Sequence, residues 1–127
     1  KNIIFTGFLS EKQLDDYYSL ADVFVAASKS ETQGLTLLEA AAHGLPIVAY
    51  DSPVVSEFIE DSGTGYIARK DFAKKIGTIL NNKKIARRFK RNGLSAVKKY
   101  SPRKCADELI RVYKSVVKSK KSNKIYQ

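Results

Sequence analysis

Short apolar runs alternate with amphipathic stretches along most of the chain. Strands 3–6, 23–26, 46–50 and 66–68 are predicted from short runs rich in β-branched residues. Apolar residues at helical spacing predict helices over 11–20, 35–43, 54–59, 72–80, 85–100 and 102–117. Strands that alternate with helices at these lengths indicate an α/β, Rossmann-like fold, with a parallel sheet and flanking helices on both faces.

Capping residues mark two of the predicted helix ends. Ser10 is expected to cap the first helix, whose inward face would carry Leu14, Tyr17 and Tyr18. Gly44 is expected in the left-handed conformation that ends the helix before the third strand.

Length and composition indicate one domain. A chain of 127 residues is long enough for a single core, which we expect over residues 1–118, and residues 119–127 form a basic tail expected to be disordered. The single cysteine, Cys105, excludes an intrachain disulfide, and no stretch reads as a signal peptide or a membrane span. These features favour a cytoplasmic protein.

Charge is divided unevenly between the two halves. Residues 1–68 hold three Lys or Arg against ten Asp or Glu, whereas residues 69–127 hold twenty against three. The basic half could bind an anionic membrane surface, nucleic acid or an acidic domain, and composition does not choose among them.

The candidate chemistry lies in the stretch 28–50. Glu31 and Glu39 are separated by seven residues, the first in a polar loop and the second in an apolar helical run. An ionised carboxylate can accept hydrogen bonds from two vicinal hydroxyls, as in a sugar diol. Gly34 stands where the loop enters the helix, and the free N–H groups of a helix start suit a phosphate.

Residues 30–49, with Glu57 downstream, resemble the donor-binding signature of the family 4 (group 1) retaining glycosyltransferases of GT-B fold. The string Ser30 to Thr36 further resembles bacterial diacylglycerol glucosyltransferases of that family. The resemblance implies part of the C-terminal, donor-binding lobe of an enzyme that moves a hexose, from UDP-glucose, to a lipid or glycan acceptor. It departs from the family at Pro53 and Val54, where paired glycines are usual.

The resemblance also implies a role for each site residue. Glu31 would be the catalytic residue beside the donor sugar, and Glu39 would bind the ribose. The donor sugar and diphosphate would be held by the residues between them: Thr32, Gln33, Gly34, Leu35 and Thr36. No cofactor and no metal are expected. An N-terminal acceptor lobe would complete the enzyme, so the 127 residues alone are expected to be inactive, with a peripheral place at the inner face of the membrane.

Other interpretations remain open. Glu39 read without the family is a solvent-facing helix residue, and His43 near a helix end is a cap or dipole partner. The basic run 83–91 is either a solvated face or a surface for anionic lipid. The alternative function is a noncatalytic nucleotide-binding or nucleic-acid-binding α/β domain. Nucleic acid is disfavoured because the aromatic residues fall on predicted apolar faces.

Overall fold

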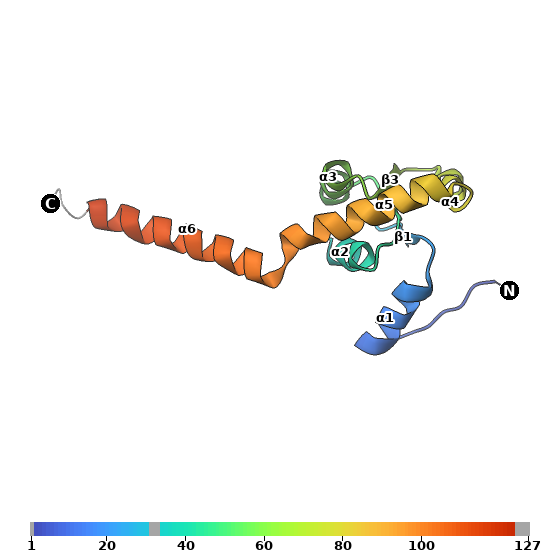
Figure 1. The fold of residues 1–127 in the computed structure, drawn as a ribbon, viewed down its shortest axis with the longest axis horizontal. Coiled ribbons are helices and arrows are strands. Elements are labelled where there is room, and N and C mark those ends of the chain that lie inside the picture. Colours follow the sequence, from blue (N-terminus) through green and yellow to red (C-terminus); the bar gives the residue numbers. More distant parts are fainter. Residues whose placement is uncertain (1, 31–33, 124–127) are drawn as a thin grey trace. The chain divides into compact units, whose positions relative to one another are not determined.

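The computed structural model describes residues 2–30 and 34–123 (Figure 1). The chain divides into two compact units, Lys1–Ala96 and Val97–Gln127. The elements follow in the order α1 (Glu11–Leu20), β1 (Phe24–Ala26), α2 (Leu35–Ala42), β2 (Ile47–Tyr50), α3 (Pro53–Ser62), β3 (Gly65–Ala68), α4 (Phe72–Leu80), α5 (Lys83–Ala96), a 3-10 turn (Val97–Tyr100) and α6 (Pro102–Asn123).

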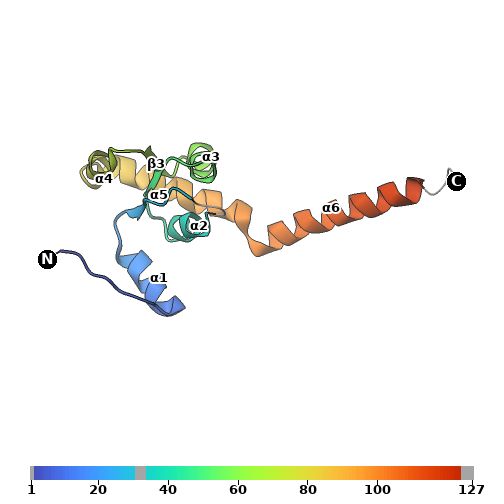
Figure 2. The same ribbon diagram turned by 180° about the vertical axis from the view of Figure 1, so that it is seen from behind.

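The first unit is built on a parallel sheet whose described strands have the order β1-β2-β3. Val48 and Ala68 point to one face and pack with Ile79 of α4 and Phe89 of α5. Helix α5 passes across the sheet in both views (Figures 1 and 2). The neighbour of Val48 on β2, Ile47, points the other way and is also fully buried, so both faces of the sheet are covered. The predicted α/β class is confirmed.

The close pairing of β2 and β3 depends on a glycine. Gly65 pairs with Ile47 across the sheet, and a Cβ on Gly65 would lie 1.9 Å from the carbonyl oxygen of Ile47. No side chain fits at that distance, so the strand spacing at this point requires glycine.

Both predicted caps are confirmed, but the predicted inner face of α1 is only partly right. Ser10 accepts a hydrogen bond from the Gln13 N–H, and Gln13 Oε1 accepts one from the Ser10 N–H. Gly44 has φ +72°. Tyr18 is buried, whereas Leu14 and Tyr17 are 37% and 48% exposed. The reason is that Tyr18 is the side chain of α1 that meets both β1 and α2.

The strand predicted over residues 3–6 is wrong. No ladder includes these residues, and Ile3, Ile4 and Phe5 are 73%, 81% and 93% exposed. A strand is stable only when a neighbour pairs with its N–H and C=O groups, and within the described residues none does so here. An apolar, β-branched run was therefore not sufficient to predict a strand at residues 3–6.

The second unit is a 3-10 turn followed by one long helix. Ser101 Oγ accepts a hydrogen bond from the Lys104 N–H at the start of α6, as expected for a Ser-Pro helix start. The helix continues through Ser119 to Asn123, so the described part of the tail is helical, and residues 124–127 lie outside the described residues. Among the helices that the structure describes, none is long and apolar enough to cross a membrane.

Candidate functional site

The three strands end at the same edge of the sheet because they are parallel. At their carboxyl ends lie the loop after β1, the Asp51–Ser52 pair after β2 and Arg69 after β3. In open parallel sheets this edge is where ligands bind. The predicted site residues belong to the loop after β1 and to the helix that follows it.

The N-terminus of α2 points its free N–H groups at this edge. Gly34 precedes the helix with φ +67°, a conformation that disfavours every residue with a side chain. Its carbonyl accepts from the Leu37 and Leu38 N–H groups, and no side chain caps the helix. Within the described residues the N–H groups of Leu35 and Thr36 have no acceptor. Two free donors at the positive end of a helix suit an anion.

A second helix begins beside the first. A Cβ on Gly34 would lie 3.4 Å from Val54 Cγ1, which places the start of α3 against the start of α2. Because of this distance, the Val54 side chain faces the turn at Gly34. Val54 is one of the two residues that depart from the family pattern. At Val54 the departure changes the wall of the candidate site, and at Pro53 it also removes one backbone N–H group from the start of α3.

Ser52 is a site candidate that the sequence reasoning missed. It precedes Pro53 at the start of α3, is 6% exposed, and its hydroxyl makes no cap hydrogen bond. Ser52 Oγ is the one fully buried side-chain oxygen or nitrogen without a partner in the part of the chain that the structure describes. A buried hydroxyl without a partner is costly, so a ligand group at this edge would relieve it. The Ser-Pro pair was the available signal.

Glu39 lies on α2, one turn beyond the free N–H groups. Its side chain is exposed, and Glu39 Oε2 accepts a hydrogen bond of 3.0 Å from the Tyr18 hydroxyl of α1. Tyr18 is 21 residues away in the sequence, so no local pattern could have predicted the contact. The contact holds one oxygen of the carboxylate in place.

The pKa of Tyr18 reflects this environment. Burial of the phenol, with the hydrogen bond to the Glu39 carboxylate and its negative charge, raises the pKa of Tyr18 from 10.0 to about 12. Tyr18 is therefore a hydrogen-bond donor to Glu39 throughout the neutral range.

His43 supports the same corner without facing the candidate site. It is the C-cap residue of α2, and its Nδ1 lies 2.9 Å from the Glu39 carbonyl oxygen. The ring stacks on Tyr18 at 4.9 Å, and Nε2 lies 3.4 Å from Asp15 Oδ1 on α1. The interpretation of His43 as a helix-end partner agrees with this geometry.

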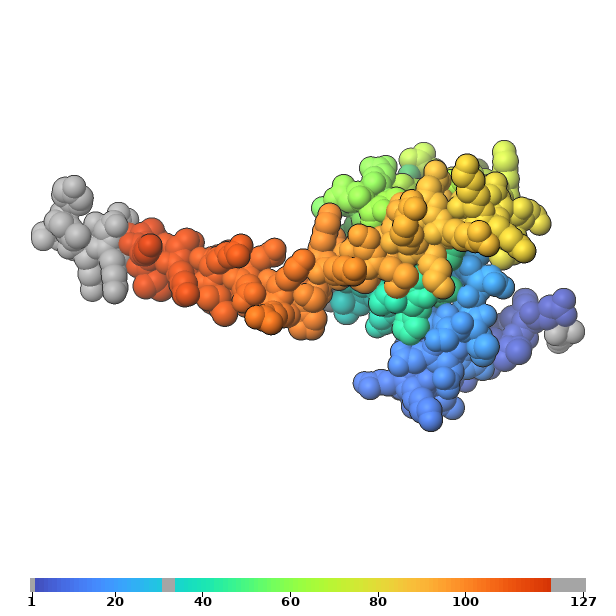
Figure 3. All heavy atoms as spheres, viewed as in Figure 1, coloured from blue at the N-terminus to red at the C-terminus, as the bar shows by residue number. Residues whose placement is uncertain are grey.

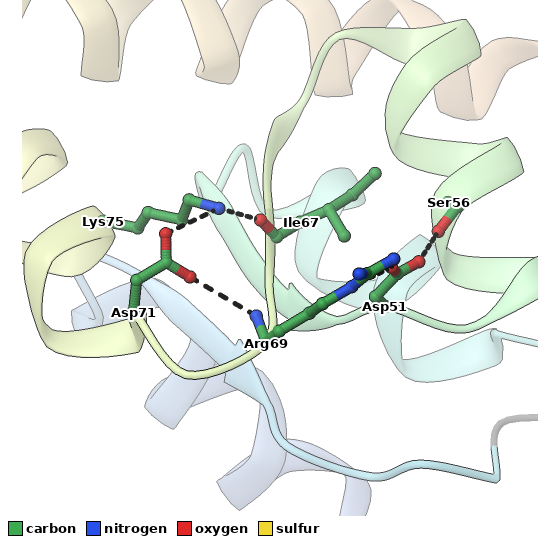
Figure 4. A network of polar contacts seen from close by, with 6 residues as sticks. All are labelled: Asp51, Ser56, Ile67, Arg69, Asp71 and Lys75. Atoms are coloured by element: carbon green, nitrogen blue, oxygen red, sulfur yellow. Dashed lines mark hydrogen bonds and ion pairs between the residues drawn. The ribbon is translucent and has the colours of Figure 1, made fainter.

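A polar network ties together the segments that follow β2 and β3 (Figure 4). Asp51 Oδ2 accepts from Arg69 Nε at 2.6 Å, and Asp51 Oδ1 accepts from the Ser56 hydroxyl at 2.8 Å. Lys75 of α4 bridges Asp71 Oδ2 and the Ile67 carbonyl.

The charges in this network are mutually supporting. The hydrogen bond from Ser56, followed by that from Arg69, lowers the pKa of Asp51. Asp71 likewise has its pKa lowered, chiefly by Lys75. These bonds fix the loops at the carboxyl edge of the sheet.

The structure therefore describes part of the predicted site. Gly34 lies immediately before α2, and Leu35, Thr36 and Glu39 lie on the first turns of that helix. Glu31, Thr32 and Gln33 lie outside the described residues. In the described part of the loop after β1, the Lys29 ammonium lies 5.6 Å from the centre of the Tyr50 ring at the end of β2. Within residues 2–30 and 34–123, no group of three or more His, Cys, Asp or Glu side chains is arranged to hold a metal ion.

Comparison with known proteins gives consistent matches. The family model described as "Glycosyl transferases group 1" matches residues 1–96. The alpha-monoglucosyldiacylglycerol synthase of Streptococcus pneumoniae is 42% identical over 81 residues, which cover 62% of this chain and 18% of that protein. The protein of the same name from Acholeplasma laidlawii is 34% identical over 122 residues, covering 93% of this chain and 31% of the relative.

A third relative is more distant. The alpha-galactosylglucosyldiacylglycerol synthase of Streptococcus pneumoniae is 28% identical over 101 residues, which cover 80% of this chain and 27% of that protein. The chain thus spans less than a third of the length of each of these relatives.

Proposed function

Because the chain belongs to the group 1 glycosyltransferase family, we propose that it is the donor-binding portion of a retaining glycosyltransferase. The resemblance drawn from residues 30–49 is confirmed at the level of the family. Two relatives are named alpha-monoglucosyldiacylglycerol synthase, which supports glucose as the transferred sugar and a lipid, diacylglycerol, as the proposed acceptor. UDP-glucose as the proposed donor rests on the family resemblance. A glycan acceptor is the alternative within the same reaction class.

The observation that carries the proposal is the start of α2. Its free Leu35 and Thr36 N–H groups would bind the diphosphate, and they lie one turn before the Glu39 carboxylate. A nucleotide sugar offers a diphosphate and a ribose diol, so the two features match two parts of one molecule. The bond from Tyr18 holds Glu39 Oε2 and leaves Glu39 Oε1 for the ribose.

The proposed chemistry assigns the remaining roles. Glu31 would steady the donor sugar as positive charge develops at its anomeric carbon, and Thr32, Gln33 and Gly34 would hold its hydroxyls. The departing diphosphate would be stabilised by N–H groups that need no reorientation, which is the form of electrostatic catalysis that gains most from a fixed site. No metal and no cofactor enter this proposal.

The proposal extends to the rest of such an enzyme. An acceptor lobe would complete the site, and the 127 residues by themselves would bind the donor without turnover. A lipid acceptor implies a cytoplasmic enzyme that works peripherally at the inner face of the membrane. The uneven charge of the chain supports this place.

A titration tests the donor site. UDP and UDP-glucose should bind the 127-residue chain weakly, and Glu39→Ala should weaken the binding about tenfold or more, because it removes charge-assisted hydrogen bonds to the ribose. Isothermal calorimetry measures both affinities.

Glu60→Ala is the matched control. Glu60 is exposed on α3, so its loss makes the same change of charge without touching α2, and the affinity should stay the same. Equal loss in both variants, or RNA binding that is tight and steeply salt-dependent while UDP does not bind, would refute the donor site.

A further inference from the structure

Helix α5 carries an unusually basic outer face. Its inner side is formed by Phe89, Gly93 and Ala96, which are buried. At 3.6 residues per turn, all cations of the helix fall on the opposite side. This face, called the α5 basic face below, consists of Lys83, Lys84, Arg87, Arg88, Lys90 and Arg91.

The chain does little to neutralise the α5 basic face. Helix α5 contains no acidic residue, and none of its cations forms an ion pair within the described residues. Lys83, Arg87 and Arg91 succeed one another at spacings of four residues, where like charges destabilise a helix. A face that bears this repulsion is suited to a partner with many negative charges.

The face is open. All of its cations except Lys90 line a hollow of about 600 Å³ together with Ile85. In the space-filling view α5 lies at the surface of its unit, turned toward the viewer (Figure 3). A broad anionic surface could therefore reach these side chains directly.

The α5 basic face lies away from Gly34 and Ser52, the proposed diphosphate end of the donor site. Arg87 and Lys90 border a second hollow with Pro46 and Asp22, which precede β2 and β1. Tyr18 and His43, the partners of Glu39, also line this hollow. Asp22 is the one carboxylate that lines it, and it forms no ion pair with either cation within the described residues. These residues mark the amino ends of the strands, whereas Gly34 and Ser52 lie at the carboxyl ends. A surface bound at α5 would leave Gly34 and Ser52 accessible.

We propose that the α5 basic face docks on an anionic lipid bilayer. The choice of lipid rests on the function proposed above, since a lipid acceptor requires the enzyme to reach a membrane. The structure favours lipid over single-stranded nucleic acid for a separate reason. Bases need exposed aromatic side chains for stacking, and the aromatic residue of α5, Phe89, is 3% exposed.

Vesicle sedimentation tests the docking face. The chain should bind vesicles that mix phosphatidylcholine with phosphatidylglycerol, should not bind pure phosphatidylcholine, and should be released by salt. In the test variant Lys83, Lys84 and Arg91 are each replaced by Gln, which spares Arg88 on the Phe89 ring and Lys90 on Gly44. Partition should fall about fivefold per charge, or about a hundredfold in all.

The control variant removes three exposed cations from α6 instead, through Arg103→Gln, Lys104→Gln and Lys114→Gln. It has the same net charge as the test variant and should keep most of the binding. Circular dichroism checks that both variants are folded. Equal or greater loss in the control, no binding to anionic vesicles, or tighter binding to a single-stranded RNA at the same salt would each overturn the proposal.

Binding of UDP to the same variants separates this inference from the proposed function. Neither triple variant alters the donor edge, so both should bind UDP as the parent chain does. If the parent chain binds UDP but not anionic vesicles, or if the test variant keeps its vesicle binding, docking at α5 alone is refuted. If the parent chain binds vesicles through α5 but does not bind UDP, the donor site alone is refuted.

Discussion

Tyr18 and Glu39 show how much of the candidate site depends on a single contact between distant residues. Glu39 is an exposed residue with apolar neighbours on α2, and the hydrogen bond from the Tyr18 hydroxyl orients its carboxylate. The tyrosine in turn is packed between Phe24 and His43. A substitution at Tyr18 should therefore change both the stability of the fold and the position of the Glu39 carboxylate.

The first residue-scale prediction concerns Tyr18→Phe. Loss of a hydrogen bond to a charged acceptor should lower the free energy of unfolding at neutral pH by about 1–2 kcal/mol, measured by urea denaturation. Tyr17→Phe, on the same helix with its side chain half exposed, should have little effect and serves as the control. A neutral result for Tyr18→Phe would mean that the contact with Glu39 contributes nothing.

The difference in stability between the parent chain and Tyr18→Phe should depend on pH. The folded pKa of Tyr18 is raised to about 12, above the ordinary 10.0, so its contribution to stability is complete below pH 10. Above that value the unfolded chain loses the Tyr18 proton while the folded chain retains it, so the contribution declines as pH rises toward 12. The stability difference between the parent chain and Tyr18→Phe should shrink over this range. A constant difference would contradict the raised pKa.

At the scale of the elements, the strands β2 and β3 approach each other because Gly65 has no side chain. Every residue of β2 except Tyr50 is buried, so this pair of strands is the centre of the first unit. Gly77, in the middle of α4, has room for a side chain. An added Cβ there would have only Asn81 Nδ2 within contact distance, at 4.0 Å.

Replacement of each glycine by alanine should have opposite effects. Gly65→Ala should lower the free energy of unfolding by about 3 kcal/mol or more, because the methyl group collides with the Ile47 backbone. Gly77→Ala should raise it by about 0.5–1 kcal/mol, because alanine favours the helix. Thermal denaturation of both variants measures the two shifts. A tolerated Gly65→Ala would show that the strand spacing is not as described.

The elements also show where sequence reasoning succeeds and where it fails. Helix ends were predictable because caps act within a few residues, as at Ser10 and Gly44. The strand predicted over residues 3–6 was wrong because pairing with a distant neighbour decides whether an apolar run becomes a strand. Ser52 and the Tyr18 contact were missed for the same reason, since burial and long-range hydrogen bonds leave no local pattern.

For the molecule as a whole, the two halves of the chain carry different charge and different proposed tasks. The acidic half holds most of the candidate donor site at the carboxyl edge of the sheet, and the basic half supplies α5. The predicted residues Leu35, Thr36 and Glu39 lie on α2 and Gly34 immediately precedes it. The roles of these residues, and those of Glu31, Thr32 and Gln33, remain predictions. The proposed donor site requires that a nucleotide binds at the start of α2.

A chemical-shift map of UDP binding on the ¹⁵N-labelled chain tests that point most directly. UDP should shift the amide signals at the starts of α2 and α3, including Gly34, Leu35, Thr36 and Ser52, and should leave those of α5 unchanged. Shifts confined to the amides of the α5 cations, or no shifts up to millimolar UDP, would contradict a donor site at the start of α2.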